Sequence, residues 1–394
     1  MRIAVVDYQL VPTNPIGGCH RTMVAGLCDE HDITVFAVRF DNPRPDRIRW
    51  VRVPVPTRPL ALLFVAFHLV APLCVAWQRL RHRQRYDLVQ MVESNLSFGD
   101  VSYAQFCHRG FLRRGGTGVR ARGLRPALRW LDHRLHALVE PWVYRRVRTV
   151  VVPSQGLQRE LAAEHPATRG KTVVIGNPVD VARMRRPASF PRDAVRAELG
   201  LGPDDVAVVF VALGHFERKG LPLLLDALAS LGDPRTKLLV VGGQPDLVRA
   251  YQQQVRRRGL GDVVTFLGMR DDVREPLWAS DVFALPSAYE AFPLVALEAA
   301  AAGLPLLVTP LHGVEDLVVE GRNGMTVART VPALTEGLRA FSALSRAERE
   351  EMGRRAQEDV QRYSPQAFLE GWRRLYEGLR RDRADAPAPG RSDG

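Results

Sequence analysis

Short apolar runs alternate along the chain with segments in which apolar residues recur every three or four positions. In the second half, the apolar runs predict buried strands over Val206–Leu213, Lys237–Gly242, Val263–Leu267, Asp281–Pro286 and Leu304–Thr309. In the first half, they predict strands over Arg2–Asp7, Ile33–Val38, Asp87–Val92, Tyr103–Cys107 and Thr149–Pro153. The segments Leu221–Leu231 and Asp246–Arg258 have the spacing of amphipathic helices. Strands that alternate with helices require crossover connections, so the pattern predicts parallel sheets covered by helices on both faces.

The chain is long enough for two such sheets. Its 394 residues exceed the roughly 250 to 300 residues at which a single hydrophobic core stops growing. A stretch rich in Pro and Arg, from Asn177 to Arg192, has no sustained periodicity and is typical of a connector. Apolar residues recur at helical spacing over Gln366–Leu379, whereas the last residues offer almost nothing to bury. We therefore predict an α/β protein with two Rossmann-like domains, residues 1–185 and 186–363, a closing helix over 364–382 and a disordered tail over 383–394.

The longest apolar segment, Leu60–Trp77, carries no formal charge and is interrupted only by His68 and Pro72. It just reaches the length of a membrane span. A span would place consecutive strands of one sheet on opposite sides of a bilayer and leave their edges unpaired, which argues against it. Two interpretations stay open: a helix packed on its own domain, and a helix in the membrane interface with the arginines of 79–85 at the lipid headgroups.

Positive charge is concentrated in the first half of the chain. Residues 1–190 contain 29 Lys and Arg against 14 Asp and Glu, whereas the whole chain has a net charge of +12. The segment Arg113–Arg148 alone contains ten arginines, with leucines interleaved at helical spacing. Aromatic residues make up 7% of the chain and form no evident stacking platform, so nucleic acid is not expected as a partner. An anionic glycolipid or membrane surface is the better candidate, and a solvated basic face is the alternative.

The cysteines Cys19, Cys28, Cys74 and Cys107 include no Cys-x-x-Cys pair, which argues against a zinc site or a redox motif. The chain starts directly with a strand-like segment, without a charged leader. We therefore expect a reduced, cytoplasmic protein, with any membrane contact at the inner face of the cytoplasmic membrane.

The strongest chemical signal directly follows the predicted strand Asp281–Pro286. Glu290 lies in a loop at the carboxyl edge of the sheet, and Glu298 follows after seven residues, inside a helix that Gly303 ends. Pro293 suits the first position of this helix, whose amino end offers unpaired N–H groups and the positive pole of the dipole to a phosphate. The segment that forms this end is Phe292, Pro293, Leu294 and Val295. Carboxylates on both sides accept hydrogen bonds from hydroxyl-rich groups, so the arrangement describes a site for a sugar nucleotide.

This Glu-x7-Glu motif, in its loop and helix context, resembles the family 4 glycosyltransferases, which are retaining enzymes of the GT-B type. The resemblance covers most of the chain and is densest over Val206–Val327. It implies two Rossmann-like domains that face a cleft, with a C-terminal helix that crosses back to the first domain. It also implies that Glu298 binds the ribose hydroxyls of the nucleotide and that Glu290 faces the donor sugar. The likeness extends to lipopolysaccharide-core and exopolysaccharide enzymes.

A second candidate site lies in the loop Gly214–Gly220, after the predicted strand Val206–Leu213. Two adjacent cations, Arg218 and Lys219, would neutralise the charge that develops on a diphosphate leaving group. The chain has only three lysines, and in the resembling family a lysine before glycine has this role. An arginine that is common earlier in this loop is absent, and Arg218 takes its place.

Three further sites rest on weaker signals. Gly17 and Gly18 follow the first strand and open a helix, which suits either a backbone approach to the donor phosphate or an ordinary turn. His108 follows its strand and corresponds by position to the histidine that the family places near the donor sugar. Phe266 and Leu267 end another strand, where family members hold the base by main-chain contacts.

The chain contains no Asp-x-Asp motif, so we expect catalysis without a bound metal and interpret Asp271 and Asp272 as helix-capping residues. The whole pattern predicts a retaining glycosyltransferase that moves a sugar from a UDP- or GDP-linked donor to a glycan or glycolipid, in bacterial cell-surface polysaccharide synthesis. No cofactor besides the donor substrate is expected. Two alternatives stay open, a sugar-nucleotide epimerase of the same fold and an inactive basic scaffold that binds polyanions. A nicotinamide-dependent oxidoreductase is disfavoured because the first turn lacks Gly-x-Gly-x-x-Gly.

Overall fold

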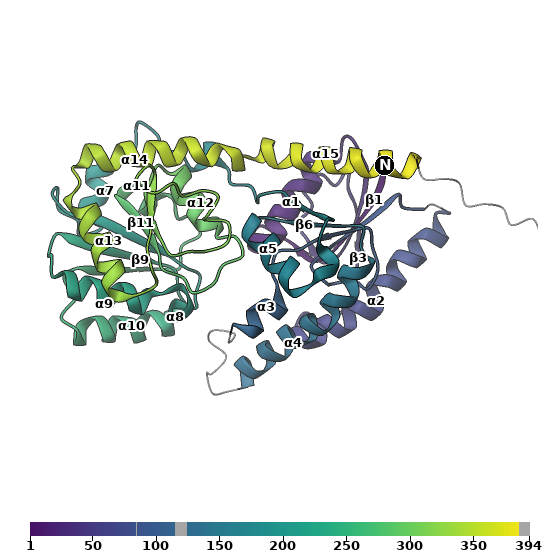
Figure 1. Cartoon of the computed structure of the whole chain (residues 1–394), viewed down its shortest axis with the longest axis horizontal. Helices are drawn as coiled ribbons and strands as arrows, with labels where there is room; N and C mark the ends of the chain where they lie inside the picture. The colour runs from purple at the N-terminus through teal and green to yellow at the C-terminus, as the bar shows by residue number, and fades with distance from the viewer. Residues whose placement is uncertain (84, 115–123, 386–394) are drawn as a thin grey trace, which may run out of the picture.

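The computed structural model describes residues 1–83, 85–114 and 124–385, which form two α/β halves with one sheet each (Figure 1). The strand order is β3-β2-β1-β4-β5-β6-β7 in the first sheet and β10-β9-β8-β11-β12-β13 in the second. All neighbouring strands in both sheets run parallel. The prediction of two parallel sheets with covering helices is therefore confirmed.

Each predicted strand corresponds to a strand of the structure, with small differences at the ends. The first sheet consists of β1 (Arg2–Leu10), β2 (Asp32–Phe40), β3 (Arg49–Arg52), β4 (Leu88–Val92), β5 (Val101–Tyr103), β6 (Thr149–Val152) and β7 (Thr172–Val174). The second consists of β8 (Val206–Val211), β9 (Thr236–Val241), β10 (Val264–Gly268), β11 (Val282–Leu285), β12 (Leu306–Val308) and β13 (Gly324–Thr326). The strand predicted over Tyr103–Cys107 is wrong after its first residue, because β5 ends at Tyr103 and a helix begins at His108.

The sequence pattern did not predict three strands, β3, β7 and β13. Each lies at an edge of its sheet and is only three or four residues long. An edge strand has no neighbour on one side and much of its surface faces water, so it needs no continuous apolar run.

Helices cover both faces of the first sheet. They are α1 (Pro15–Leu27), α2 (Leu60–Arg81), α3 (His108–Arg113), α4 (Leu124–Arg146) and α5 (Gln155–Glu164). Along β1, Ala4 and Val6 pack in one core with residues of α2, α4 and α5, whereas Ile3 and Val5 pack in a second core with residues of α1. Both faces of the strand are therefore buried, as the apolar run predicts.

The second half has one continuous core around its sheet. Its helices are α6 (Val181–Met184), α7 (Arg192–Glu198), α8 (Phe216–Lys219), α9 (Leu221–Leu231), α10 (Pro245–Arg257), α11 (Arg274–Ala279), α12 (Leu294–Ala301), α13 (Val331–Ala343) and α14 (Arg346–Asp359). The side chains of Val179, Val181 and Met184 pack in this second core. The domain boundary near residue 185 stays a prediction.

The chain crosses between the halves twice, and the two crossings touch. The N–H of Val179 donates to the carbonyl of Tyr363 at 2.9 Å. After the second crossing, α15 (Pro365–Ala384) runs along the first half, where Phe368, Trp372 and Tyr376 pack in the same core as α1. The closing helix is thus confirmed. It includes Arg383 and Ala384, which were predicted as tail, and residues 386–394 of that tail lie outside the described residues.

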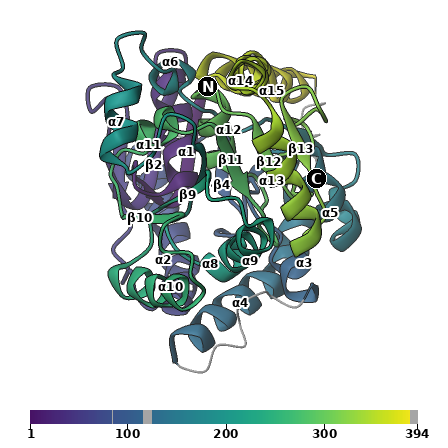
Figure 2. The same ribbon diagram turned by 90° about the vertical axis from the view of Figure 1, so that its left-hand side faces the viewer.

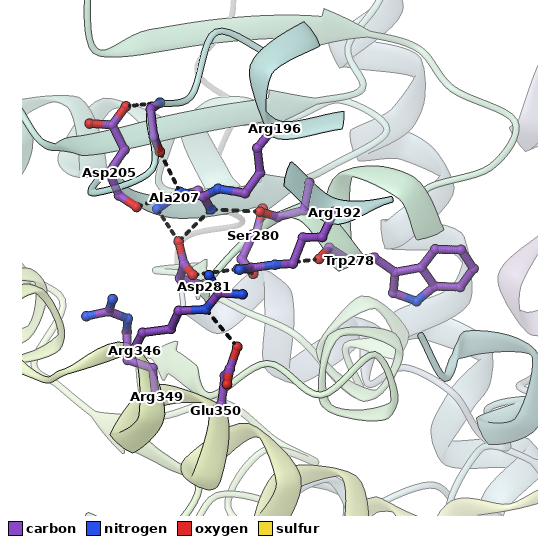
Figure 3. A network of polar contacts seen from close by, with 12 residues as sticks. Arg192, Arg196, Asp205, Ala207, Trp278, Ser280, Asp281, Arg346, Arg349 and Glu350 are labelled. Atoms are coloured by element: carbon purple, nitrogen blue, oxygen red, sulfur yellow. Dashed lines mark hydrogen bonds and ion pairs between the residues drawn. The ribbon is translucent and has the colours of Figure 1, made fainter. Parts of the chain in front are cut away.

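A buried carboxylate fastens the start of the second half to its sheet (Figure 3). Asp281 Oδ1 accepts from Arg192 Nη2 at 2.6 Å, and Oδ2 accepts from Arg196 Nη1 at 2.9 Å and from Ala207 N at 2.8 Å. The ion pairs link α7 to the strands β8 and β11, and the Asp281 side chain is only 6% exposed. Removal of one partner from a buried ion pair leaves an uncompensated charge.

We predict that Asp281→Ala lowers the free energy of unfolding by about 3 to 5 kcal/mol, because it leaves Arg192 and Arg196 buried without their carboxylate partner. Urea denaturation followed by circular dichroism measures this loss. Asp246→Ala is the matched control, since Asp246 pairs with Arg249 on the surface and an exposed pair contributes about 1 kcal/mol or less. Equal effects of the two substitutions would contradict the prediction.

Candidate active site

Glu290 lies at the carboxyl edge of the second sheet, in the loop that joins β11 to α12. One carboxylate oxygen, Oε1, has three partners: Lys219 Nζ at 2.6 Å, the Ser287 hydroxyl at 2.8 Å and Arg218 Nη1 at 3.3 Å. Among the described residues, the other oxygen has no hydrogen-bond partner. The structure therefore brings the predicted residues Glu290, Lys219 and Arg218 together, and leaves one oxygen free to meet a ligand.

The two cations reach Glu290 because their loop packs against the β11–α12 loop. Arg218 and Lys219 end α8, and Gly220 follows in the left-handed conformation with φ +86°. A Cβ atom at Gly220 would lie 2.1 Å from the carbonyl oxygen of Pro286, so only glycine permits this approach. The carbonyl of Arg218 also accepts from Ala288 N at 2.8 Å. The two motifs thus form one structural unit.

The charge of Lys219 depends on Glu290. Burial lowers the pKa of Lys219, and Arg218 lowers it further, whereas the ion pair with Glu290 opposes both effects. Desolvation disfavours the ammonium form and a nearby carboxylate favours it. Glu290 therefore keeps a positive charge beside the start of α12.

The helix start matches the predicted phosphate cradle, with one correction. Pro293 precedes the helix, which begins at Leu294, and proline has no N–H to offer. The N–H groups of Leu294 and Val295 have no acceptor within the described part of the chain, so they are open to an anion. Phe292, just upstream, packs with its ring 5.6 Å from that of Tyr363.

Glu298 lies one turn inside α12, in a largely apolar setting. Burial raises its pKa to about 7, with Asp272 adding to the shift and Arg183 opposing it. Its carboxylate also adds to the burial that raises the pKa of Cys19, on α1, to about 12. The carboxylate of Glu298 is therefore near enough to α1 of the first half to influence a group on that helix.

The first half contributes a histidine cluster. Nδ1 of His108 shares a hydrogen bond of 2.9 Å with Nδ1 of His133. Its Nε2 lies 3.2 Å from Glu93 Oε2. Its ring stacks on His136 at 4.2 Å, with an interplanar angle of 10°. Burial lowers the pKa of His108, but Glu93 and other carboxylates outweigh this effect and raise it above its usual value.

Side chains of the two halves contact one another near these groups. Arg129 on α4 contacts the ring of His215, next to α8, at 3.1 Å. Glu160 on α5 accepts from the hydroxyl of Tyr289 at 3.0 Å, and His312 Nε2 lies 3.1 Å from the same oxygen. Because Tyr289 is the neighbour of Glu290, the contact between the halves is built next to the candidate site.

The glycine pair has a structural explanation at one position. Asn14 caps α1, and its side chain accepts from Gly17 N at 3.0 Å. A Cβ atom at Gly17 would lie 2.1 Å from the carbonyl oxygen of Gln9, whereas the nearest atom to one at Gly18 is 3.9 Å away. Packing against β1 thus requires glycine at 17 but not at 18. A donor contact of Gly17 and Gly18 stays a prediction.

Phe266 and Leu267 lie near the carboxyl end of β10, at the edge of the sheet. In the loop that follows, Asp272 Oδ1 accepts from the N–H of Arg274, the first residue of α11, at 3.0 Å. The N-cap residue of this helix is Val273, however, so neither Asp271 nor Asp272 occupies the predicted cap position. The effect of Asp272 on Glu298 shows that this loop lies near α12. The binding of a base by Phe266 and Leu267 stays a prediction.

Two groups of side chains, among the residues that the structure places, come close enough to ligate a metal: Glu93, His108 and His136, and Cys107, Glu140 and His165. The stacked rings of His108 and His136 do not aim their in-plane lone pairs at one point. In the second group, Glu140 already accepts from His108 N, Arg109 N and His165. Neither geometry favours a metal, and catalysis without one stays a prediction.

Sequence reasoning missed Glu93, His133, His136 and Tyr289. A partial signal existed, since Glu93 directly follows a predicted strand and Tyr289 precedes Glu290. His133 and His136 lie three residues apart in the arginine-rich segment, which was interpreted only as a charged surface. Arg120 and Arg122 of that segment lie outside the described residues.

Both halves of the chain match models of glycosyltransferase families. Residues 206–343 match the family model "Glycosyl transferases group 1", and residues 21–183 match "Glycosyltransferase Family 4". An uncharacterised glycosyltransferase of Methanocaldococcus jannaschii is 25% identical over 345 residues, which cover 83% of this chain and 85% of that protein.

Solved structures share the fold along nearly the whole chain. WaaG, a glycosyltransferase of lipopolysaccharide biosynthesis, superposes with a TM-score of 0.72 at 19% identity and covers 93% of this chain and 97% of its own. HepE of Anabaena, in complex with UDP, has a TM-score of 0.72 at 20% identity and covers 96% and 100%. The fold is therefore GT-B, with its crossing C-terminal helix, and the chain belongs to the group 1 and family 4 glycosyltransferases.

Proposed function

We propose that this enzyme transfers a sugar, with retention of anomeric configuration, from a nucleotide-sugar donor on the second half to a glycan or glycolipid acceptor on the first half. The observation that carries this proposal is the pairing of Lys219 and Arg218 with Glu290, in the loop that leads directly into α12. Cations and free N–H groups at one point suit a diphosphate, and the free Glu290 oxygen suits a sugar hydroxyl.

Departure of the nucleotide diphosphate is the step that these cations favour. Negative charge grows on the leaving oxygen as the bond to the sugar breaks, so fixed positive charge stabilises the transition state more than the bound donor. Lys219 and Arg218 are already held in place by Glu290 before the donor arrives. Little reorganisation is then needed when the charge develops.

His108 is placed to contact the sugar from the opposite side. Its partners His133 and Glu93 fix the orientation of its ring, and Glu93 favours the charged form. A charged imidazole donates at both nitrogens, and here both are engaged by His133 and Glu93, so a sugar hydroxyl would have to replace one of these partners. The UDP held by the structural neighbour HepE supports a uridine donor, and a GDP-linked donor is the alternative.

A membrane-borne acceptor explains an apolar stripe on α2. The inner side of α2, with Leu63, Phe67 and Ala71, packs in the core, which confirms a helix packed on its own domain. Its outer side is also apolar, since Leu69, Leu73, Trp77 and Leu80 are 66%, 67%, 61% and 76% exposed. By length and composition alone, α2 is apolar enough to cross a membrane. A helix with a buried inner side is better suited to lie in the interface.

The neighbouring helix α4 extends this surface. Trp130, Leu138 and Trp142 are 40%, 70% and 42% exposed, and the guanidinium of Arg146 lies 3.7 Å from the centre of the Trp142 ring. In both views, α2 and α4 lie on the side of the molecule away from α14 and α15 (Figure 1 and Figure 2). Tryptophans at headgroup depth with arginines beside them are typical of an anionic membrane surface.

We predict that Glu290→Ala and Lys219→Ala each reduce transfer by at least about a hundredfold, because each removes charge stabilisation at the reacting centre. Sugar transfer from radiolabelled nucleotide sugars measures the loss, and unchanged circular dichroism shows that folding is intact. Wild-type turnover in both variants would contradict the proposed site. Conversion of the donor without any acceptor would instead support an epimerase, and an inverted product by NMR would rule out retention.

We predict that the KM for the donor falls by up to about tenfold between pH 6 and pH 8, because Glu298, with a pKa of about 7, must ionise to accept both ribose hydroxyls. At low pH the carboxyl is protonated and loses acceptor strength. Steady-state kinetics over this range give the profile. Glu298→Gln should flatten it and raise KM more than it lowers kcat, and a profile that is unchanged in this variant would contradict the role of Glu298.

We predict that the enzyme binds vesicles containing phosphatidylglycerol at low salt, and that Leu69→Ser with Leu73→Ser weakens binding by at least about tenfold, since each leucine contributes roughly 1.5 kcal/mol or more when buried. Cosedimentation measures the bound fraction. Val173→Ser with Val174→Ser removes two exposed apolar side chains from β7 and serves as the control. Equal binding by both variants, or a dimer formed through α2 without lipid, would contradict a membrane surface.

A further inference from the structure

A second cationic site lies on the opposite edge of the second sheet from Glu290. A cavity of about 340 Å³ is enclosed by the connector between the halves, α11 and α14. Asp281 and Leu304 line it; Asp281 directly precedes β11, and only Pro305 separates Leu304 from β12. Glu290 follows β11, so the sheet separates this cavity from the candidate active site.

Arginine dominates the lining of the cavity. The five arginines are Arg185, Arg186, Arg192, Arg349 and Arg354, and the two acids are Asp281 and Glu350. Both acids already have cationic partners, since Asp281 pairs with Arg192 and Arg196 and Glu350 pairs with Arg346 (Figure 3). The cavity therefore has more positive charge than its own acids balance.

Three of these arginines have no carboxylate partner among the described residues. Arg186 contacts only the carbonyl of Trp278, and Arg349 donates only to the carbonyls of Phe341 and Leu344. Arg185 has neither an ion pair nor a side-chain hydrogen bond within those residues. Arg349 is 8% exposed, and its buried Nε has no partner. Burial lowers the pKa of Arg186 and of Arg349, and the nearby carboxylates of Asp281 and Glu350 offset this effect only in part.

The surroundings favour a small, multiply charged ligand. Two guanidinium groups bind one phosphate through planar pairs of N–H donors, and arginines on separate elements suit several such groups in a row. Trp278 also lines the cavity, where its ring is held by Phe190 at 5.2 Å and by a hydrogen bond to the carbonyl of Met184. The volume is at the lower end of the range for small-molecule sites.

We propose that this cavity binds a small metabolite through two or more linked phosphate groups, with Arg185 and Arg186 of the connector and Arg349 of α14 as its ligands, whereas Arg354 is already paired with Glu351 and Glu358. The connector forms the first crossing between the halves, and α14 leads into the second. A bound anion thus joins the two segments by which the chain passes between its halves. The site is independent of the donor site and does not rest on the proposed transferase mechanism.

The test uses inorganic pyrophosphate and isothermal titration calorimetry on the full chain carrying Lys219→Ala, which weakens the diphosphate site of the active centre. We expect this variant to bind pyrophosphate at one site, and orthophosphate at least about tenfold more weakly, since it offers fewer oxygens to the arginines. Addition of Arg185→Gln and Arg186→Gln should weaken pyrophosphate binding by at least about tenfold. Both side chains are exposed, so their loss does not threaten folding.

The matched control is Arg380→Gln with Arg381→Gln, which removes the same charge from an exposed pair on α15. It should bind pyrophosphate like its parent. Absence of pyrophosphate binding in the Lys219→Ala parent, or equal affinity of the connector and control variants, would overturn the proposal. Loss of transfer activity has no bearing on either result, so the proposed function and this site fail separately.

Discussion

The candidate site depends on one carboxylate oxygen that accepts hydrogen bonds from three donors. Glu290 Oε1 holds Lys219, Arg218 and Ser287, and in doing so it joins two loops that are 71 residues apart between Lys219 and Glu290. Two like cations next to each other repel, and burial weakens their charge further. A carboxylate between the two cations reduces their repulsion and favours their charged forms. Positive charge is therefore present when a diphosphate binds.

The central strands could be predicted from the sequence because buried parallel strands need continuous apolar runs. Val206–Val211 is such a run, with helices on both sides. Edge strands such as β3 and β13 carry no such requirement and were missed. The pairing of Glu290 with Lys219 was predictable only as two separate signals at strand ends. Their contact depends on a left-handed Gly220 and its approach to Pro286, which is a property of the folded chain and not of spacing.

The histidine cluster could not be predicted from the sequence, for a different reason. His133 and His136 occupy the inner side of α4, and their neighbours Arg134 and Leu138 occupy the outer side. The density of arginine in this segment hid the buried positions, because a charged surface and a polar buried side follow the same helical period. The same helix thus presents tryptophan and leucine outwards and orients His108 inwards, which places the proposed membrane surface one helix diameter from the reacting groups.

The two edges of the second sheet use positive charge in opposite ways. At the carboxyl edge, Glu290 compensates Lys219 and Arg218, and an incoming donor has to share them with that carboxylate. At the amino edge, Asp281 is shared by Arg192 and Arg196, and the arginines around them exceed the acids. Cations that already pair with a carboxylate suit a substrate that must enter and leave, because they have an anionic partner both with and without the substrate. Within the described ranges, the buried Arg349 has only carbonyl partners, so an anion that binds beside it relieves the cost of burying an unpaired charge, and its departure restores that cost.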